Sequence, residues 1–155
     1  MISSRTAAAI HRPRRERGFD VARFLLDTNI CIYIRQKRPP EVLARFEKLK
    51  VGDACLSVIT YGELLYGARK SKQRDVALAR LTDLVSLLPV LEMPSEAASQ
   101  YGEIRAGLEA RGETIGGNDL WIAAHAKAEG LVLVTNNERE FGRVPGLKVQ
   151  NWARA

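Results

Sequence analysis

Phe24-Leu25-Leu26-Asp27-Thr28-Asn29 is the stretch that decides the fold, because a short apolar run leads directly into an acid and two small polar residues. A continuous apolar run of this kind is typical of a strand buried on both faces of a sheet. Asp27 would then stand at the carboxyl end of the strand, and Thr28 or Asn29 would cap a following helix. Ligands of open α/β sheets bind at the carboxyl ends of the strands, so Asp27 is a candidate site residue as well as an ordinary cap.

Strands alternate with helices along the rest of the chain. Further strands are predicted at 54–58, 90–93, 131–134 and 147–149. Helices are predicted at 30–36, after Pro39-Pro40, and at 60–70, 72–87, 95–111, 118–129 and 138–142. This alternation predicts the α/β class, as a three-layer α/β/α sandwich around a mainly parallel sheet of about five strands.

Size and composition narrow the class of protein. The chain has 155 residues, of which 46% are apolar, and this suits one domain with a substantial core. No apolar run approaches the roughly 20 residues of a membrane helix, so no membrane segment is predicted. Cys31 and Cys55 lie in apolar surroundings and form no CxxC motif, so we expect small core residues in a reducing cytoplasm rather than metal ligands.

The positive charge is concentrated at the amino terminus. Residues 1–23 carry six arginines against two acids, which accounts for four of the net charge of +6. Residues 1–20 show no helical or strand period, and Val21 is a candidate start of translation. We therefore expect a disordered basic extension over residues 1–22 and a single domain over residues 23–155. Such an extension binds nucleic acid through phosphates or is simply solvated, and charge alone does not decide between the two.

Further acids follow the other predicted strands, and each has a structural explanation. The pattern Thr60-x-x-Glu63 is a capping box, and Asn137-x-x-Glu140 is a capping pattern as well. Asp119 lies in the first turn of a predicted helix, where a carboxylate offsets the helix dipole. Taken one at a time, these positions are explained at least as well by helix capping as by function.

Taken together, the polar residues at the strand ends indicate a site. The carboxyl ends of parallel strands lie at one edge of a sheet, where Asp27, Glu63, Asp119 and Asn137 or Glu140 are expected to converge. Carboxylates held close together repel one another, which raises a pKa or requires a cation. Oxygen ligands without Cys or His select a hard ion such as Mg²⁺ or Mn²⁺. Because such an ion activates water and holds a phosphate oxygen, the pattern favours phosphodiester hydrolysis.

Four short motifs together resemble those of a known family. They are Leu26-Asp27-Thr28-Asn29, Tyr61-Gly62-Glu63-Leu64, Ile115-Gly116-Gly117-Asn118-Asp119, and Val134-Thr135-Asn136-Asn137 with Arg139-Glu140-Phe141. In order and spacing they resemble the PIN-domain family, and within it the VapC-type toxins of type II toxin–antitoxin modules. The resemblance covers about residues 24–152. It implies a PIN-like nuclease domain that hydrolyses RNA as a Mg²⁺-dependent endoribonuclease, with Mn²⁺ able to substitute.

The resemblance also implies roles for the site residues. Asp27 and Asp119 would be direct metal ligands, and Glu63 would complete the acidic cluster directly or through a water. Thr28 would orient a carboxylate from a second layer, while Asn118 would be a helix cap.

The fourth family position departs from the pattern. It is often Asp, whereas this chain offers the amide of Asn137, and Glu140 could supply the missing charge. His125 follows Asp119 by six residues on another side of the same helix, and we assign it no catalytic role.

The resemblance further implies partners. These are an RNA substrate, a small VapB-like antitoxin whose tail enters the acidic groove, and a second copy in a homodimer. Two other readings stay open. One is a receiver-like Mg²⁺-binding signalling domain, and the other is a non-catalytic RNA-binding or repressor partner. The receiver needs a Lys after a late strand, and Thr135 occupies the position after residues 131–134.

Overall fold

The computed structural model describes residues 22–154. The elements are β1 (Phe24–Leu26), α2 (Thr28–Gln36), α3 (Pro40–Glu47), β2 (Ala54–Ser57), α4 (Val58–Arg69), α5 (Arg74–Leu87), β3 (Val90–Leu91), α6 (Glu96–Ala110), α7 (Gly117–Glu129), β4 (Val132–Val134), α8 (Glu138–Phe141) and β5 (Val149–Gln150). The predicted extension over residues 1–22 and the candidate start at Val21 lie outside the described residues, apart from Ala22, which is buried.

β1 is the central strand of a five-stranded sheet whose order is β3-β2-β1-β4-β5. All four pairings are parallel, and Leu25 of β1 lies between Cys55 of β2 and Leu133 of β4. The predicted parallel α/β sheet is therefore confirmed. Because every strand runs the same way, the residues that follow the strands emerge at one edge.

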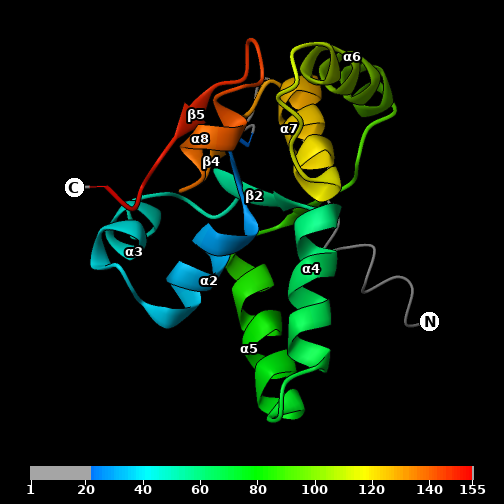
Figure 1. Ribbon diagram of the computed structural model, residues 1–155. Coiled ribbons are helices and arrows are strands. Elements are labelled where there is room, and N and C mark those ends of the chain that lie inside the picture. Colours follow the sequence, from blue (N-terminus) through cyan, green and yellow to red (C-terminus); the bar gives the residue numbers. More distant parts are fainter. Residues whose placement is uncertain (1–21, 155) are drawn as a thin grey trace.

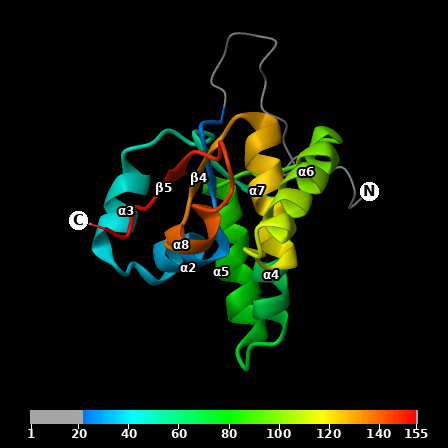
Figure 2. The same cartoon turned by 45° about the horizontal axis from the view of Figure 1, so that its top comes forward.

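Helices cover both faces of this sheet, as predicted for a three-layer sandwich. Leu25 belongs to a buried cluster that includes Ile104 of α6 and Ile122 of α7. The next residue, Leu26, belongs to a second cluster with side chains of α2, α3, α4 and α5. Successive side chains of a strand point to opposite faces, so the apolar run of β1 supplies both cores. Figures 1 and 2 show α6 and α7 side by side, on the side of the sheet away from α2 and α3.

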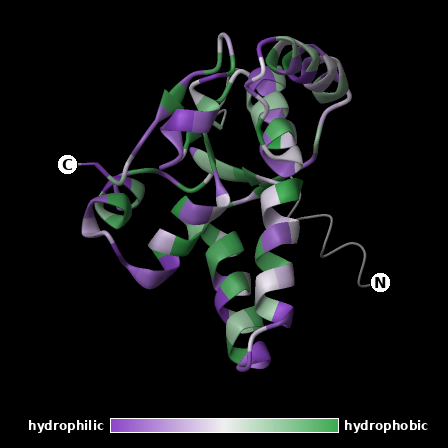
Figure 3. Cartoon of the chain, in the orientation of Figure 1, coloured by the Kyte–Doolittle hydropathy of each residue, from purple (hydrophilic) through white to green (hydrophobic). Residues whose placement is uncertain are grey.

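α4 and α5 form a helical hairpin that projects beyond the sheet (Figure 1). Leu64 and Ala68 of α4 share a buried cluster with Leu81 and Leu84 of α5. Figure 3 shows that the far end of the hairpin is hydrophilic, so its tip is suited to solvent. Across residues 22–154 no helix has the length and apolar character needed to cross a membrane.

The structure corrects three predicted helix starts. α4 begins at Val58, because the Ser57 hydroxyl accepts the Ile59 N–H at 3.2 Å. Thr60 therefore lies inside the helix, fully buried, and its pairing with Glu63 is not a capping box. α2 is capped by Asp27 itself, rather than by Thr28 or Asn29.

The third wrong start concerns α7, whose N-cap is Gly116. Asn118 is inside the first turn and does not cap it, although Asp119 does lie in that turn as predicted. Gly130 ends α7 in the left-handed conformation at φ 67°, which glycine adopts without strain. The last strand also lies later than predicted, at Val149–Gln150 rather than at 147–149.

Candidate active site

The predicted polar residues meet at the carboxyl edge of the sheet. Asp27 follows β1 directly, and Thr135 follows the neighbouring strand β4. Glu63 comes from the second turn of α4, Asp119 from the first turn of α7, and Glu140 from α8. A cavity of about 180 Å³ lies among them, lined by Asp27, Thr28, Asn29, Glu63, Asp119, Ile122, Asn137 and Phe141. We call this the acidic cavity.

Asp27 lines the acidic cavity and is held there by hydrogen bonds. It is only 6% exposed, and its Oδ1 accepts the Ile30 N–H at 3.0 Å as the cap of α2. Its Oδ2 accepts a short hydrogen bond from the Thr135 hydroxyl. Burial raises the pKa of Asp27, the bonds from Thr135 and the backbone oppose that rise, and nearby Glu63 adds to it. The capping role and the site position therefore coexist in one residue, since each carboxylate oxygen has a second lone pair.

Thr28 and Glu63 form the next wall of the cavity. The Thr28 hydroxyl donates to Glu63 Oε1 at 2.7 Å, which links the start of α2 to α4. Thr28 therefore lies where it can orient this carboxylate, as the family resemblance implied. Glu63 is half-buried and remains within reach of a ligand in the cavity.

Asn137, the N-cap of α8, also lines the cavity, and Glu140 of α8 lies next to it. Asn137 caps this helix by accepting the Glu140 N–H at 3.4 Å, and its side-chain amide donates to Glu140 Oε2 at 2.6 Å. The predicted capping pattern is therefore present. The same contact holds the Glu140 carboxylate beside Asp119, and its charge is one cause of the raised pKa there.

Asp119 is the most perturbed carboxylate of the cavity. Its pKa is raised from an ordinary 3.8 to about 6, first by burial and then by the charges of Glu140, Glu63 and Asp27. No hydrogen bond to its carboxylate occurs within residues 22–154, so nothing there offsets the repulsion. A carboxylate in a cavity with several like charges is typical of a functional site, because repulsion of this kind lowers the stability of the fold.

The donor set of the cavity fits a hard divalent cation. Its ionisable ligands are carboxylates alone, the preference of Mg²⁺ and Mn²⁺. Within residues 22–154 no three His, Cys, Asp or Glu side chains are close enough to share one ion. A Mg²⁺ site does not require three such side chains, because the ion keeps several waters and takes only one or two carboxylates directly. A volume of about 180 Å³ has room for such waters, each of which occupies about 30 Å³ in the liquid.

His125 lies outside the acidic cavity, in the core. It is fully buried, and its Nδ1 is 2.9 Å from the Ser57 hydroxyl oxygen. Burial lowers the pKa of His125 to about 4, so the ring is neutral at pH 7. The expectation of a packed histidine without a catalytic role agrees with this position.

Thr135 is the site residue that sequence reasoning missed. It is fully buried, donates to Asp27, and accepts the Asn137 N–H at 2.9 Å. One hydroxyl thus joins the carboxylate after β1 to the cap of α8. Its signal in the sequence is its place directly after the strand next to β1, where the predicted site roles fell on Asn137 and Glu140 instead.

Comparison with known proteins agrees with the fold. Residues 24–147 match the PIN domain. The chain is 46% identical over 130 residues to ribonuclease VapC2 of Haemophilus influenzae, covering 84% of this chain and 98% of that protein. It is 44% identical over 131 residues to the tRNA(fMet)-specific endonuclease VapC of Shigella flexneri, covering 84% and 98%.

A solved structure gives the same result. The crystal structure of DNA-bound VapBC from Salmonella typhimurium superposes with a TM-score of 0.80 at 42% identity. The match covers 85% of this chain and 99% of that one.

Proposed function

The chain belongs to the PIN-domain family and is an endoribonuclease of its VapC type, and we propose that Asp27, Glu63 and Asp119 hold the metal ion of its active site. Ribonucleases of this family generally depend on a divalent metal. We infer that the ion here is Mg²⁺, for which Mn²⁺ substitutes. The observation that carries the proposal is that Asp27, Glu63 and Asp119 line one cavity. The raised pKa of Asp119 in these surroundings supports it.

Each side chain has a distinct part in this proposal. Asp27 and Asp119 bind the ion directly, and Glu63 completes the cluster through a water. Thr28 orients Glu63 through its 2.7 Å hydrogen bond. Thr135 fixes Asp27 in the same manner. When bound, a divalent ion lowers the pKa of a water and offsets charge on a phosphate oxygen.

Asn137 acts from the lining of the cavity, and Glu140 acts from behind it. Asn137 supplies an amide where the family often has a carboxylate, and it holds Glu140 through a 2.6 Å hydrogen bond. Glu140 therefore supplies negative charge beside Asp119 without being a required direct ligand.

We infer that the substrate is RNA and that hydrolysis by water leaves 5′-phosphate and 3′-hydroxyl ends. Relatives at 46% and 44% identity are called a ribonuclease and a tRNA-specific endonuclease, which supports RNA. The solved VapBC complex supports a small VapB-like antitoxin as partner. A homodimer, a cytoplasmic location, and a basic extension over residues 1–22 ahead of a single nuclease domain complete the proposal.

The receiver-like alternative fits the topology poorly. Receiver domains have the strand order 2-1-3-4-5, whereas this sheet has the order β3-β2-β1-β4-β5. No lysine follows β2, β3 or β4 directly, since those positions hold Val58, Glu92 and Thr135. A non-catalytic role is the remaining alternative, and it is one outcome of the test below.

The test is RNA cleavage by purified protein with Mg²⁺, with Mn²⁺, and after EDTA treatment. Cleavage should require one of the two ions and stop with EDTA. Asp119→Asn protein purified identically is the control for contaminating nuclease. Cleavage that persists in EDTA but is absent from the control preparation would refute the metal site, and no cleavage under any condition would favour a non-catalytic role.

A further inference from the structure

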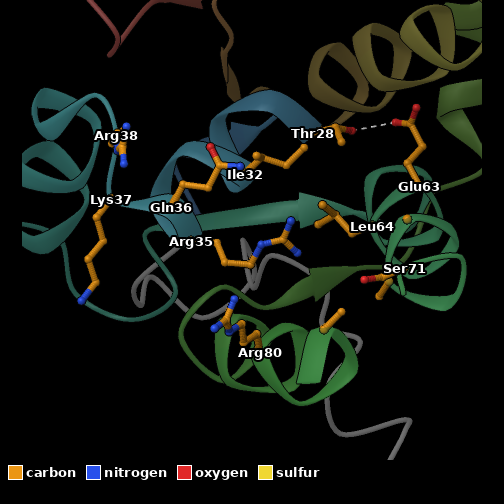
Figure 4. A pocket seen from close by; sticks show the side chains of 13 residues that line it. Thr28, Ile32, Arg35, Gln36, Lys37, Arg38, Glu63, Leu64, Ser71 and Arg80 are labelled. Carbon is orange, nitrogen blue, oxygen red and sulfur yellow. Dashed lines mark hydrogen bonds between the residues drawn. The ribbon is translucent and has the colours of Figure 1, made fainter. Parts of the chain in front are cut away.

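A second pocket, wider than the acidic cavity, opens between α2, α4 and α5. Its volume is about 940 Å³, and its charged wall consists of Arg35, Lys37, Arg38, Arg80 and Glu63. We call it the arginine pocket. Thr28 and Glu63 line both this pocket and the acidic cavity, so the two spaces adjoin. Figure 4 shows the Thr28–Glu63 hydrogen bond at one end of the arginine pocket.

Arg35 and Arg80 reach into this pocket from opposite sides. Figure 4 shows both side chains extending into the space between α2 and α5, while Lys37 lies further from Glu63. Four basic residues thus line the pocket against one acid, and that acid already accepts a hydrogen bond from Thr28. Within residues 22–154 neither Arg35 nor Arg80 forms an ion pair.

Other arginines of the molecule are paired differently. Arg111 lies 2.9 Å from Glu113, and Arg23 lies 3.3 Å from Asp53. Two guanidinium groups that face one pocket and form no ion pair within residues 22–154 suit the binding of an anion. Guanidinium groups bind phosphates through two parallel hydrogen bonds, and a phosphate therefore matches the geometry of such groups.

We propose that the arginine pocket binds the phosphate backbone of single-stranded RNA beside the bond that is cut. This inference rests on the proposed function and adds the substrate-positioning residues Arg35 and Arg80. The acidic cavity repels a polyanion, and the basic residues of the adjoining arginine pocket offset that repulsion. Glu63 stands at the boundary of the two regions, and a strand crossing it would place one phosphate at the acids and another at the arginines.

The direct test is binding of a fluorescent single-stranded RNA in EDTA, measured at several salt concentrations. Removing two phosphate contacts with the Arg35→Gln/Arg80→Gln variant should weaken binding about tenfold or more in 0.1 M salt. It should also reduce the slope of log affinity against log salt by about 1.4, since each contact to a single strand contributes about 0.7. Arg80 is exposed, so Arg80→Gln alone keeps the fold and should remove about half of that slope.

Arg74→Gln is the matched control, because Arg74 is an exposed arginine of the same helix that does not line the pocket. It should leave the affinity and the salt slope nearly unchanged. Lysine at positions 35 and 80 should restore the slope, since charge rather than shape sets it. Melting temperatures of all variants establish that they are folded. The melting temperature of Arg35→Gln should not fall, because the change removes one of two like charges.

Cleavage kinetics separate this inference from the proposed function. With metal present, the double variant should raise KM more than it lowers kcat. An unchanged salt slope in a protein that still cleaves RNA would overturn the arginine pocket alone. If that slope stays constant while binding of an acidic antitoxin peptide weakens, the pocket serves the antitoxin and the inference is wrong. A reduced slope in a chain that never cleaves RNA would retain the pocket and overturn the nuclease site.

Discussion

The acidic cavity and the arginine pocket share Thr28 and Glu63 as a wall, yet each gathers charge of the opposite sign. At the cavity, burial and the charges of Glu140, Glu63 and Asp27 raise the pKa of Asp119 to about 6. In the pocket, two arginines lack an ion pair within the described chain. Electrostatic attraction alone would favour ion pairs between these arginines and carboxylates. Their separation into two regions is what we expect if the acidic cavity binds a cation and the arginine pocket binds a phosphate.

The largest expected effect comes from breaking the acidic cavity alone. Asp119→Asn should reduce RNA cleavage more than about 100-fold, because residues that only orient a metal ligand already contribute up to about that factor. RNA binding in EDTA should stay equal or become tighter, since one repelling charge is gone. Cleavage and binding measured on the same preparation test this contrast with the arginine variants. Asp119→Asn protein that cleaves normally would contradict the assignment of the site.

The next prediction concerns the hydrogen bonds that hold Asp27 in the acidic cavity, rather than the charge of the cavity. Thr135→Val removes the hydroxyl that donates to buried Asp27 and accepts the Asn137 N–H. We expect a loss of about 1–3 kcal/mol in the free energy of unfolding, the usual result of leaving a buried polar group without its partner. Denaturant unfolding at one pH measures it.

Thr135→Ser is the control for this change, because serine keeps the hydroxyl and should recover most of the lost stability. A valine variant as stable as the parent would show that the bond to Asp27 does not hold the site together.

A smaller effect is expected from pH, which titrates the acids and leaves the arginines charged. The folded-state pKa of Asp119 is about 6, above its ordinary 3.8, so the folded protein holds this proton at higher pH than the unfolded chain does. The contribution of Asp119 to stability in EDTA therefore falls as the pH rises from about 4 to above 6.

The pH effect is measured as a difference between two proteins. Burial lowers the pKa of His125 to about 4, which changes stability in the opposite direction but equally in parent and variant. In EDTA, Asp119→Asn should gain melting temperature over the parent between pH 4 and 7. A difference in melting temperature that does not change with pH would mean that the fold does not disfavour the charged form of Asp119.

Much of the site was predictable because it depends on local order in the chain. An apolar strand followed by an acid places Asp27 at the sheet edge whatever packs around it. Glu63 and Asp119 also lie just after the start of helices. An error of one or two residues in the predicted helix start therefore still left them at the carboxyl edge of the sheet. The start of α4 was wrong because Ser57 and Thr60 are both acceptable caps by type, and tertiary packing buried Thr60.

Other features depend on contacts that sequence patterns do not contain. The hydroxyl of Thr135 reaches Asp27 only because β4 pairs with β1, and this adjacency crosses 108 positions of the chain. Arg35 and Arg80 look like ordinary charged residues on two separate helices. They face one pocket only because α2 and α5 pack on the same side of the sheet.

Asp75→Asn is the natural reference for the most direct measurement, since Asp75 is an exposed acid in the first turn of α5. An ordinary first-turn acid stabilises its helix by about 0.3–1 kcal/mol. Replacing Asp75 should therefore lower the melting temperature slightly, and by the same amount with and without metal.

The central claim is that Asp119 serves a metal site and not the helix, and melting temperatures of parent and Asp119→Asn in EDTA and in Mn²⁺ test it most directly. At pH 7.5 in EDTA the variant should melt at least as high as the parent, because burial and the neighbouring carboxylates disfavour the charge of Asp119. In Mn²⁺ the parent should gain stability by mass action and overtake the variant. If the variant instead melts lower by the same margin in both conditions, as Asp75→Asn should, Asp119 only stabilises its helix and the account is contradicted.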